Sequence, residues 1–178
     1  MTSQRILLIG GLLLFLSGIS YAMFYHIIIQ HGYQQSLLYN LDMALNMAVK
    51  GDFEAASAFA MQYNSESAAH TIHIRIPLYL MMTGVLTAPL LMASRHIEAS
   101  ERMQRIFALL VVLGGFMLGS GEIITVYGPE KLGYLISLGG YSWIFFGLLG
   151  YIIYTMLYMW LHETPKANRN KRERSGIN

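Results

Sequence analysis

Four long apolar blocks dominate the hydrophobic pattern, at residues 6–29, 76–94, 106–127 and 135–161. Each block is long enough to cross ~30 Å of hydrocarbon at a helical rise of ~1.5 Å per residue. Backbone polar groups in lipid must be satisfied within the segment, so we expect each block to be an α-helix. The pattern therefore predicts an all-α fold, a four-transmembrane-helix bundle with both chain ends on one side.

The first block also has a feature of a cleaved signal peptide, because Ser20 and Ala22 form a small-residue cleavage site. The apolar run continues past this site through MFYHIII. It therefore exceeds the apolar core of a signal peptide, which is ~7–15 residues long. We expect an uncleaved first span, with cleavage as the alternative.

A polar segment, residues 30–75, separates the first two spans. Lys50-Gly51-Asp52 in its middle indicates a helix stop, a turn and an N-cap. Apolar residues before this turn recur at helical spacing: Leu37, Leu38, Leu41, Leu45, Ala48 and Val49. We expect a second helix after the turn, so the segment predicts a helical hairpin. The hairpin is too small to hold its own core and must lie on the bundle, the membrane surface or a partner.

The remaining boundaries follow from polar stretches. A second break is expected at Asn64-Ser65, with Ser65 as the N-cap of the helix that enters the second span. Short loops are expected at 95–105 and 128–134. The tail at 162–178 is polar and basic, and we expect it to be disordered.

Lysine and arginine placement predicts the orientation. Nine of these residues lie on the side of the chain ends: Arg5, Arg95, Arg102, Arg105, Lys166, Arg169, Lys171, Arg172 and Arg174. The other side carries three, which are Lys50, Arg75 and Lys131. The positive-inside rule therefore places residues 1–5, 95–105 and the tail in the cytoplasm, and the hairpin outside the inner (plasma) membrane.

Composition narrows the class of protein. Hydrophobic residues make up 54% of the 178 residues and charged residues 12%, against about 25% charged in a soluble domain. Mean hydropathy is +0.44. These values exclude a free nucleic-acid binder and a cytosolic enzyme. The absence of cysteine excludes disulfides, thiolate metal sites and iron–sulfur clusters. No P-loop, GxSxG or HExxH motif occurs, so we do not expect the chain to be an enzyme by itself.

Several residues within the spans have structural explanations. Gly115 and Gly119 form GxxxG, and the fourth span carries Gly139, Gly140, Gly147 and Gly150, a pattern that predicts close helix packing. Pro77 and Pro89 predict kinks in the second span. Aromatic residues near the expected span ends are typical of interfacial belts, and we assign them no chemistry: Tyr21, Tyr25, Tyr79, Tyr127, Tyr134, Trp143, Tyr158 and Trp160.

The histidines supply the candidate chemistry. His96 and His162 lie near cytoplasmic span ends, where we expect no function for them. Glu66, His70 and His73 stand at i, i+4 and i+7, which places them on one stripe of a helix. This stripe leads into the second span from the outer side.

The first hypothesis for this cluster is one haem b. His26 and either His70 or His73 would be its axial ligands between two helices. Arg75 would neutralise a propionate. Arg75 is also the expected partner of Glu122, because a carboxylate inside a span is costly unless it is paired or wet.

The second hypothesis is one copper or zinc ion bound by Glu66, His70 and His73 with His26 or His31, since imidazole and carboxylate suit these metals. In the third hypothesis, the histidines form hydrogen bonds in a protein that works through contacts with other proteins.

Taken together, the sequence predicts a small integral membrane subunit or accessory protein that contacts lipid and a membrane-protein partner or a second copy. The alternative is a haem b or copper/zinc protein that relays electrons to or from a periplasmic partner.

Overall fold

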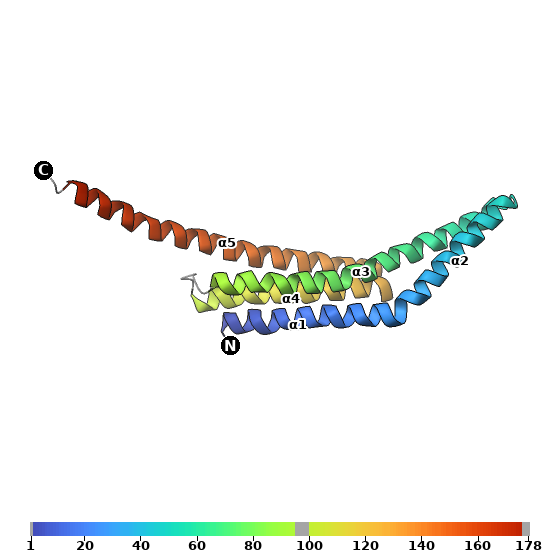
Figure 1. The fold of residues 1–178 in the computed structure, drawn as a ribbon, viewed down its shortest axis with the longest axis horizontal. Coiled ribbons are helices and arrows are strands. Elements are labelled where there is room, and N and C mark those ends of the chain that lie inside the picture. Colours follow the sequence, from blue (N-terminus) through green and yellow to red (C-terminus); the bar gives the residue numbers. More distant parts are fainter. Residues whose placement is uncertain (1, 95–99, 176–178) are drawn as a thin grey trace.

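The computed structural model describes residues 2–94 and 100–175. The order of elements is α1 (Ser3–Phe24), a π-helical turn (Tyr25–Ile29), α2 (Gln30–Val49), α3 (Phe53–Ser94), α4 (Glu101–Tyr127) and α5 (Glu130–Ser175). Helix α1, the C-terminal half of α3, α4 and the first part of α5 lie side by side as a bundle (Figure 1). Helix α2 and the N-terminal half of α3 project together from one end of this bundle. We call this pair of helical segments the projection.

Four segments of the described chain are long and apolar enough to span a membrane: Ser3–Val49, Phe53–Ser94, Glu101–Tyr127 and Glu130–Leu157. This confirms an all-helical chain with four candidate spans. Helix α3 has 42 residues, which gives it a length of about 63 Å at ~1.5 Å per residue. A hydrocarbon core of ~30 Å covers about half of that length.

The bundle is held together by apolar side chains from all of its helices. One cluster joins Leu7 of α1, Leu90 of α3, Val111 of α4 and Tyr151 of α5. A second cluster, nearer the projection, includes Leu14, Ile76, Leu80 and Val112. Large apolar residues also cover the outside of the bundle, as expected of a surface that faces lipid rather than water.

Glycines allow α4 to approach its neighbours closely. A Cβ atom added to Gly140 would lie 2.7 Å from the carbonyl oxygen of Gly114, and one added to Gly133 would lie 2.6 Å from that of Gly121. On the other side of α4, a Cβ atom at Gly115 would lie 2.6 Å from the Thr83 side chain. The close packing predicted from the glycine pattern is therefore confirmed.

The turn at Lys50-Gly51-Asp52 lies where the sequence predicts it. Gly51 has a φ of 80°, a left-handed conformation that glycine adopts without strain. The backbone N–H of Ala55 donates to Asp52 Oδ1 at 3.1 Å, so Asp52 caps the first turn of α3.

The predicted break at Asn64-Ser65 is wrong. Helix α3 continues through these residues without interruption. Ser65 Oγ donates to the carbonyl oxygen of Gln62 at 2.9 Å, so its hydroxyl is satisfied inside the helix and caps nothing. Alanine, methionine and glutamine on either side are strong helix formers, and one polar pair does not end such a helix.

Helix α5 continues to Ser175, through the tail for which the sequence predicts disorder. A helix that is already formed lengthens without a new nucleation step, and lysine, arginine and glutamate have good helix propensity. His96 lies outside the described residues, as does the side chain of His162.

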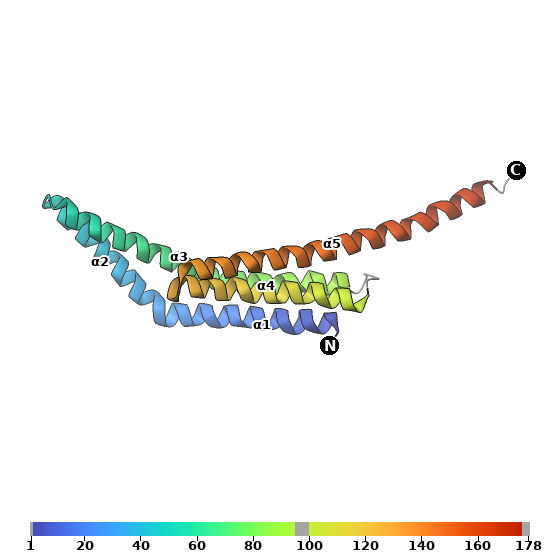
Figure 2. The same ribbon diagram turned by 180° about the vertical axis from the view of Figure 1, so that it is seen from behind.

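The chain changes direction between the bundle and the projection through the π-helical turn Tyr25–Ile29. Figure 2 shows the same bend from behind. A π-helical turn inserts one extra residue into a helix and is a common cause of a kink. On the facing helix, Pro77 lies inside α3. Proline has no N–H, so the carbonyl of His73, four residues earlier, lacks its intrahelical donor.

Candidate functional site

Six aromatic and imidazole side chains gather where the projection joins the bundle. We call them the tyrosine–histidine cluster. They come from α1, the π-helical turn, α2, α3 and α4: Tyr21, Tyr25, Tyr33, His70, His73 and Tyr127.

His73 is the centre of this cluster, and its side chain is 0% exposed. Its Nδ1 atom lies 2.7 Å from the hydroxyl of Tyr21. Its Nε2 atom lies 3.4 Å from the hydroxyls of Tyr33 and Tyr127. A neutral imidazole has one donor and one acceptor nitrogen, and a tyrosine hydroxyl serves as either. Both ring nitrogens of this buried imidazole therefore have hydroxyl partners.

Tyr25 packs against both histidines. Its ring stacks on that of His73 with centroids 5.1 Å apart and planes inclined by 19°. Its hydroxyl is hydrogen-bonded to Nδ1 of His70. Tyr21 and Tyr25 are four residues apart and His70 and His73 three apart, so each pair lies on one face of its helix.

The structure does not bring His26 or His31 into this cluster. Tyr25, rather than its neighbour His26, faces α3. His26 is exposed, and its Nδ1–H donates to Gln30 Oε1 one turn along the chain. His31 is exposed as well, and it accepts a hydrogen bond of 3.0 Å from Gln35 Nε2.

Glu66 continues the stripe of His70 and His73, but it is engaged in joining the two helices of the projection. Its Oε2 atom accepts a hydrogen bond of 3.0 Å from Nδ2 of Asn40, a side chain that is 1% exposed. In the part of the chain that the structure describes, no three histidine, aspartate or glutamate side chains form a metal-binding group. A metal site therefore stays a prediction. Of its expected ligands, the structure brings together the imidazoles of His70 and His73, both on α3.

The residues present do not fit a haem held between His26 and His73. An axial ligand needs a free imidazole nitrogen that points at the iron. Both nitrogens of His73 face tyrosine hydroxyls, and Tyr25 covers its ring. His26 makes its hydrogen bond on the exposed surface, away from these contacts.

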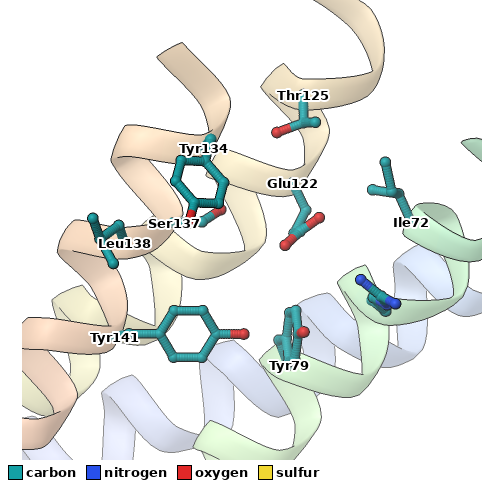
Figure 3. Close-up of a pocket in the computed structure, with 9 residues that line it drawn as sticks. Ile72, Tyr79, Glu122, Thr125, Tyr134, Ser137, Leu138 and Tyr141 are labelled. Carbon is teal, nitrogen blue, oxygen red and sulfur yellow. The ribbon is translucent and has the colours of Figure 1, made fainter. Parts of the chain in front are cut away.

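A second polar site lies between α3, α4 and α5. On α3 it includes Arg75, which is two residues after His73. It is a cavity of about 330 Å³, which we call the interhelical cavity. Figure 3 shows the Glu122 carboxylate pointing into it, towards Tyr79 and Tyr141. Its other polar lining residues are Arg75, Thr125, Tyr134 and Ser137.

Arg75 and Glu122, which the sequence predicts to pair, share a cavity without forming an ion pair. Both residues line the interhelical cavity, and the Arg75 charge acts on Glu122 across it. Arg75 and Glu122 do not form an ion pair within 4.0 Å. Among the side chains that the structure describes, the pair that does joins Arg105 and Glu101, at 3.0 Å. Arg75 and Glu122 therefore face the same space without direct contact.

Sequence reasoning found the histidines and missed the tyrosines. The aromatic pattern predicts an interfacial belt for Tyr21 and Tyr25, whereas their hydroxyls bind His73 and His70. The available signal was their spacing of four residues, which matches the stripe on the facing helix. Tyr33 carried no such signal, because the direction of α2 depends on the π-helical turn.

The fold and these sites define a class, a multi-pass helical membrane protein whose tyrosine–histidine cluster and interhelical cavity lie towards one end of the bundle. Comparison with protein families, curated proteins and solved structures finds no match to the chain.

Proposed function

We propose that this protein is a small integral membrane subunit or accessory protein that binds a membrane-protein partner through the projection. The observation that carries the proposal is the surface of the projection. Among residues 30–72, Asn40 alone is buried. Large apolar side chains are exposed instead: Leu38, Tyr39, Leu41, Leu45, Val49, Phe53 and Met61. Exposed apolar surface of this kind is typical of an interaction site.

The tip of the projection exposes two large apolar side chains. Val49 is 88% exposed and Phe53 is 74% exposed, one on either side of the turn. Two helices joined in this way bury too little surface to be stable alone. The hydrogen bond from Asn40 to Glu66 and the tyrosine–histidine cluster hold the two helices together. This leaves their apolar face free for a partner.

The orientation belongs to the same proposal. The arginine and lysine pattern supports an orientation with both chain ends in the cytoplasm and residues 30–75 outside the inner membrane. The partner then contacts the chain on the periplasmic side. A second copy of the chain is the other candidate occupant of this surface.

A photocrosslinking experiment tests the proposal. A photoreactive phenylalanine analogue is placed at Val49 or Phe53, and at Leu12, which is 57% exposed on the bundle, as a control. We expect protein adducts from Val49 and Phe53 in intact membranes, and none from Leu12. An adduct near twice the chain mass of 20.1 kDa identifies a second copy. The absence of protein adducts at both tip positions would contradict the proposal.

The cofactor alternative is the second candidate, supported by the two imidazoles that meet in the tyrosine–histidine cluster. Copper or zinc bound by His70 and His73 would displace a tyrosine hydroxyl that faces a His73 nitrogen. Metal analysis of the purified chain, compared with His70→Ala and His73→Ala, tests it. Stoichiometric metal that both substitutions remove would favour this candidate, and a Soret band would restore the haem hypothesis.

A further inference from the structure

The interhelical cavity combines two opposite charges that are not in direct contact. Arg75 of α3 and Glu122 of α4 both line it without forming an ion pair. A carboxylate inside an apolar helix is costly unless something compensates its charge. A ligand that carries both a cation and an anion would contact both side chains at once. A purely anionic ligand would instead be repelled by Glu122.

Ser137 supplies an independent sign of a ligand. This residue lines the cavity from α5 and is 6% exposed. Its Oγ atom has no hydrogen-bond partner. A buried hydroxyl without a partner is costly, so a polar group that reached Ser137 from the cavity would stabilise the fold as well as bind.

The position of the cavity indicates where such a ligand comes from. Arg75 directly precedes the expected second span, Thr125 is near the end of the third, and Ser137 is near the start of the fourth. The cavity therefore lies at the expected outer boundary of the hydrocarbon, where lipid headgroups are found. Leu138 of its lining is 50% exposed, and the neighbouring Leu135 is 63% exposed. These side chains form an apolar surface along which acyl chains fit.

We propose that the interhelical cavity binds the headgroup of an ethanolamine phospholipid. The phosphate contacts the Arg75 guanidinium, and the primary ammonium group contacts the Glu122 carboxylate. The rings of Tyr79 and Tyr141 flank the ammonium group, as aromatic rings do around cations. The volume of about 330 Å³ is within the usual range for ligand pockets, ~300–1,000 Å³. This site is separate from the projection, and it does not depend on the partner contact proposed above.

Native mass spectrometry of the full chain in detergent tests this assignment. The chain is offered phospholipids with identical acyl chains and ethanolamine, choline or glycerol headgroups. We expect ethanolamine lipid to be retained about tenfold more strongly than glycerol lipid, the ratio given by one charge-assisted hydrogen bond. Choline lipid should fall between them, because its cation has no N–H donor. Equal retention of the three lipids would overturn the proposal.

Charge-removing variants locate the site. Arg75→Gln and Glu122→Gln should each lower retention of ethanolamine lipid about tenfold. Lys50→Gln and Glu54→Gln remove the same charges at the tip of the projection, and they should leave retention unchanged. Circular dichroism verifies that each variant folds. If a cavity variant misfolds, the headgroup preference of the unmodified chain still decides. Equal effects of the cavity and tip variants would overturn the location.

Free O-phosphoethanolamine distinguishes the two sources of this headgroup chemistry. It lacks acyl chains and therefore has no contact with Leu135 or Leu138. We expect it to leave bound ethanolamine lipid in place at millimolar concentration. Binding of the free compound without retention of the lipid would overturn the lipid-borne form.

Discussion

Replacing His73 with alanine tests whether the tyrosine–histidine cluster fixes the projection to the bundle. The substitution removes a side chain that is 0% exposed, and loss of a buried side chain of this size costs ~2–5 kcal/mol. It also removes the partner of Tyr21 at 2.7 Å, a loss of about 1 kcal/mol. The contacts to Tyr33 and Tyr127, at 3.4 Å, are long and add little. We therefore expect His73→Ala to lower the free energy of unfolding by about 3–6 kcal/mol.

The assay is reversible unfolding in mixed micelles with a rising fraction of denaturing detergent, followed by circular dichroism and tryptophan fluorescence. His31→Ala is the matched control, because His31 is exposed and bonded to its own helix. Its effect should stay within about 0.5 kcal/mol. His73→Gln keeps a donor and an acceptor, and it should recover part of the loss. Equal stability of His73→Ala and His31→Ala would refute the structural role of the cluster.

Two further predictions concern packing and orientation. Gly140→Ala should destabilise the chain by about 1–3 kcal/mol in the same assay, because its Cβ atom would meet the Gly114 carbonyl oxygen at 2.7 Å. Gly32→Ala has open space around its Cβ atom and should stabilise α2 by up to about 1 kcal/mol, so a gain of stability at Gly140 would contradict the close contact. The chain has no cysteine, so single cysteines report orientation. A membrane-impermeant maleimide should label Ser57→Cys in intact cells, and Ser100→Cys after permeabilisation alone. The opposite pattern would reverse the proposed topology.

The sequence was sufficient to predict the helical spans because lipid imposes a strong rule on them. Long apolar runs have to be helical there, and the glycine pattern had a direct consequence in the contact between Gly114 and Gly140. The turn at Gly51 was equally readable from local residue types. These features depend on near neighbours or on the solvent, and both can be seen in a single sequence.

The break at Ser65 was mispredicted because capping residues also occur inside helices. A serine hydroxyl bonds to a carbonyl of the preceding turn as readily as it caps a helix. The polar–apolar pattern cannot separate these two cases. To predict that α3 continues through Ser65, one also needs to know on which side α2 packs, and this depends on the whole arrangement of the projection.

The composition of the candidate sites was harder to predict for a related reason. The π-helical turn Tyr25–Ile29 sets which face of α2, and therefore whether Tyr33, is turned towards His73 on α3. Such a turn changes the register of everything after it, and no local residue pattern announces it. The shared cavity of Arg75 and Glu122 was foreseen as a pairing, but its open space depends on the distances between three helices.

The unbroken course of α3 has a mechanical consequence. A rod that runs from Phe53 to Ser94 transmits force along its whole length. The segment from Phe53 to His73 is about 30 Å long at ~1.5 Å per residue. It pivots at the point where the His73 carbonyl lacks a backbone hydrogen bond, because Pro77 has no N–H. A sideways pull at the tip is therefore delivered as torque to the residues that follow, where Arg75 borders the cavity.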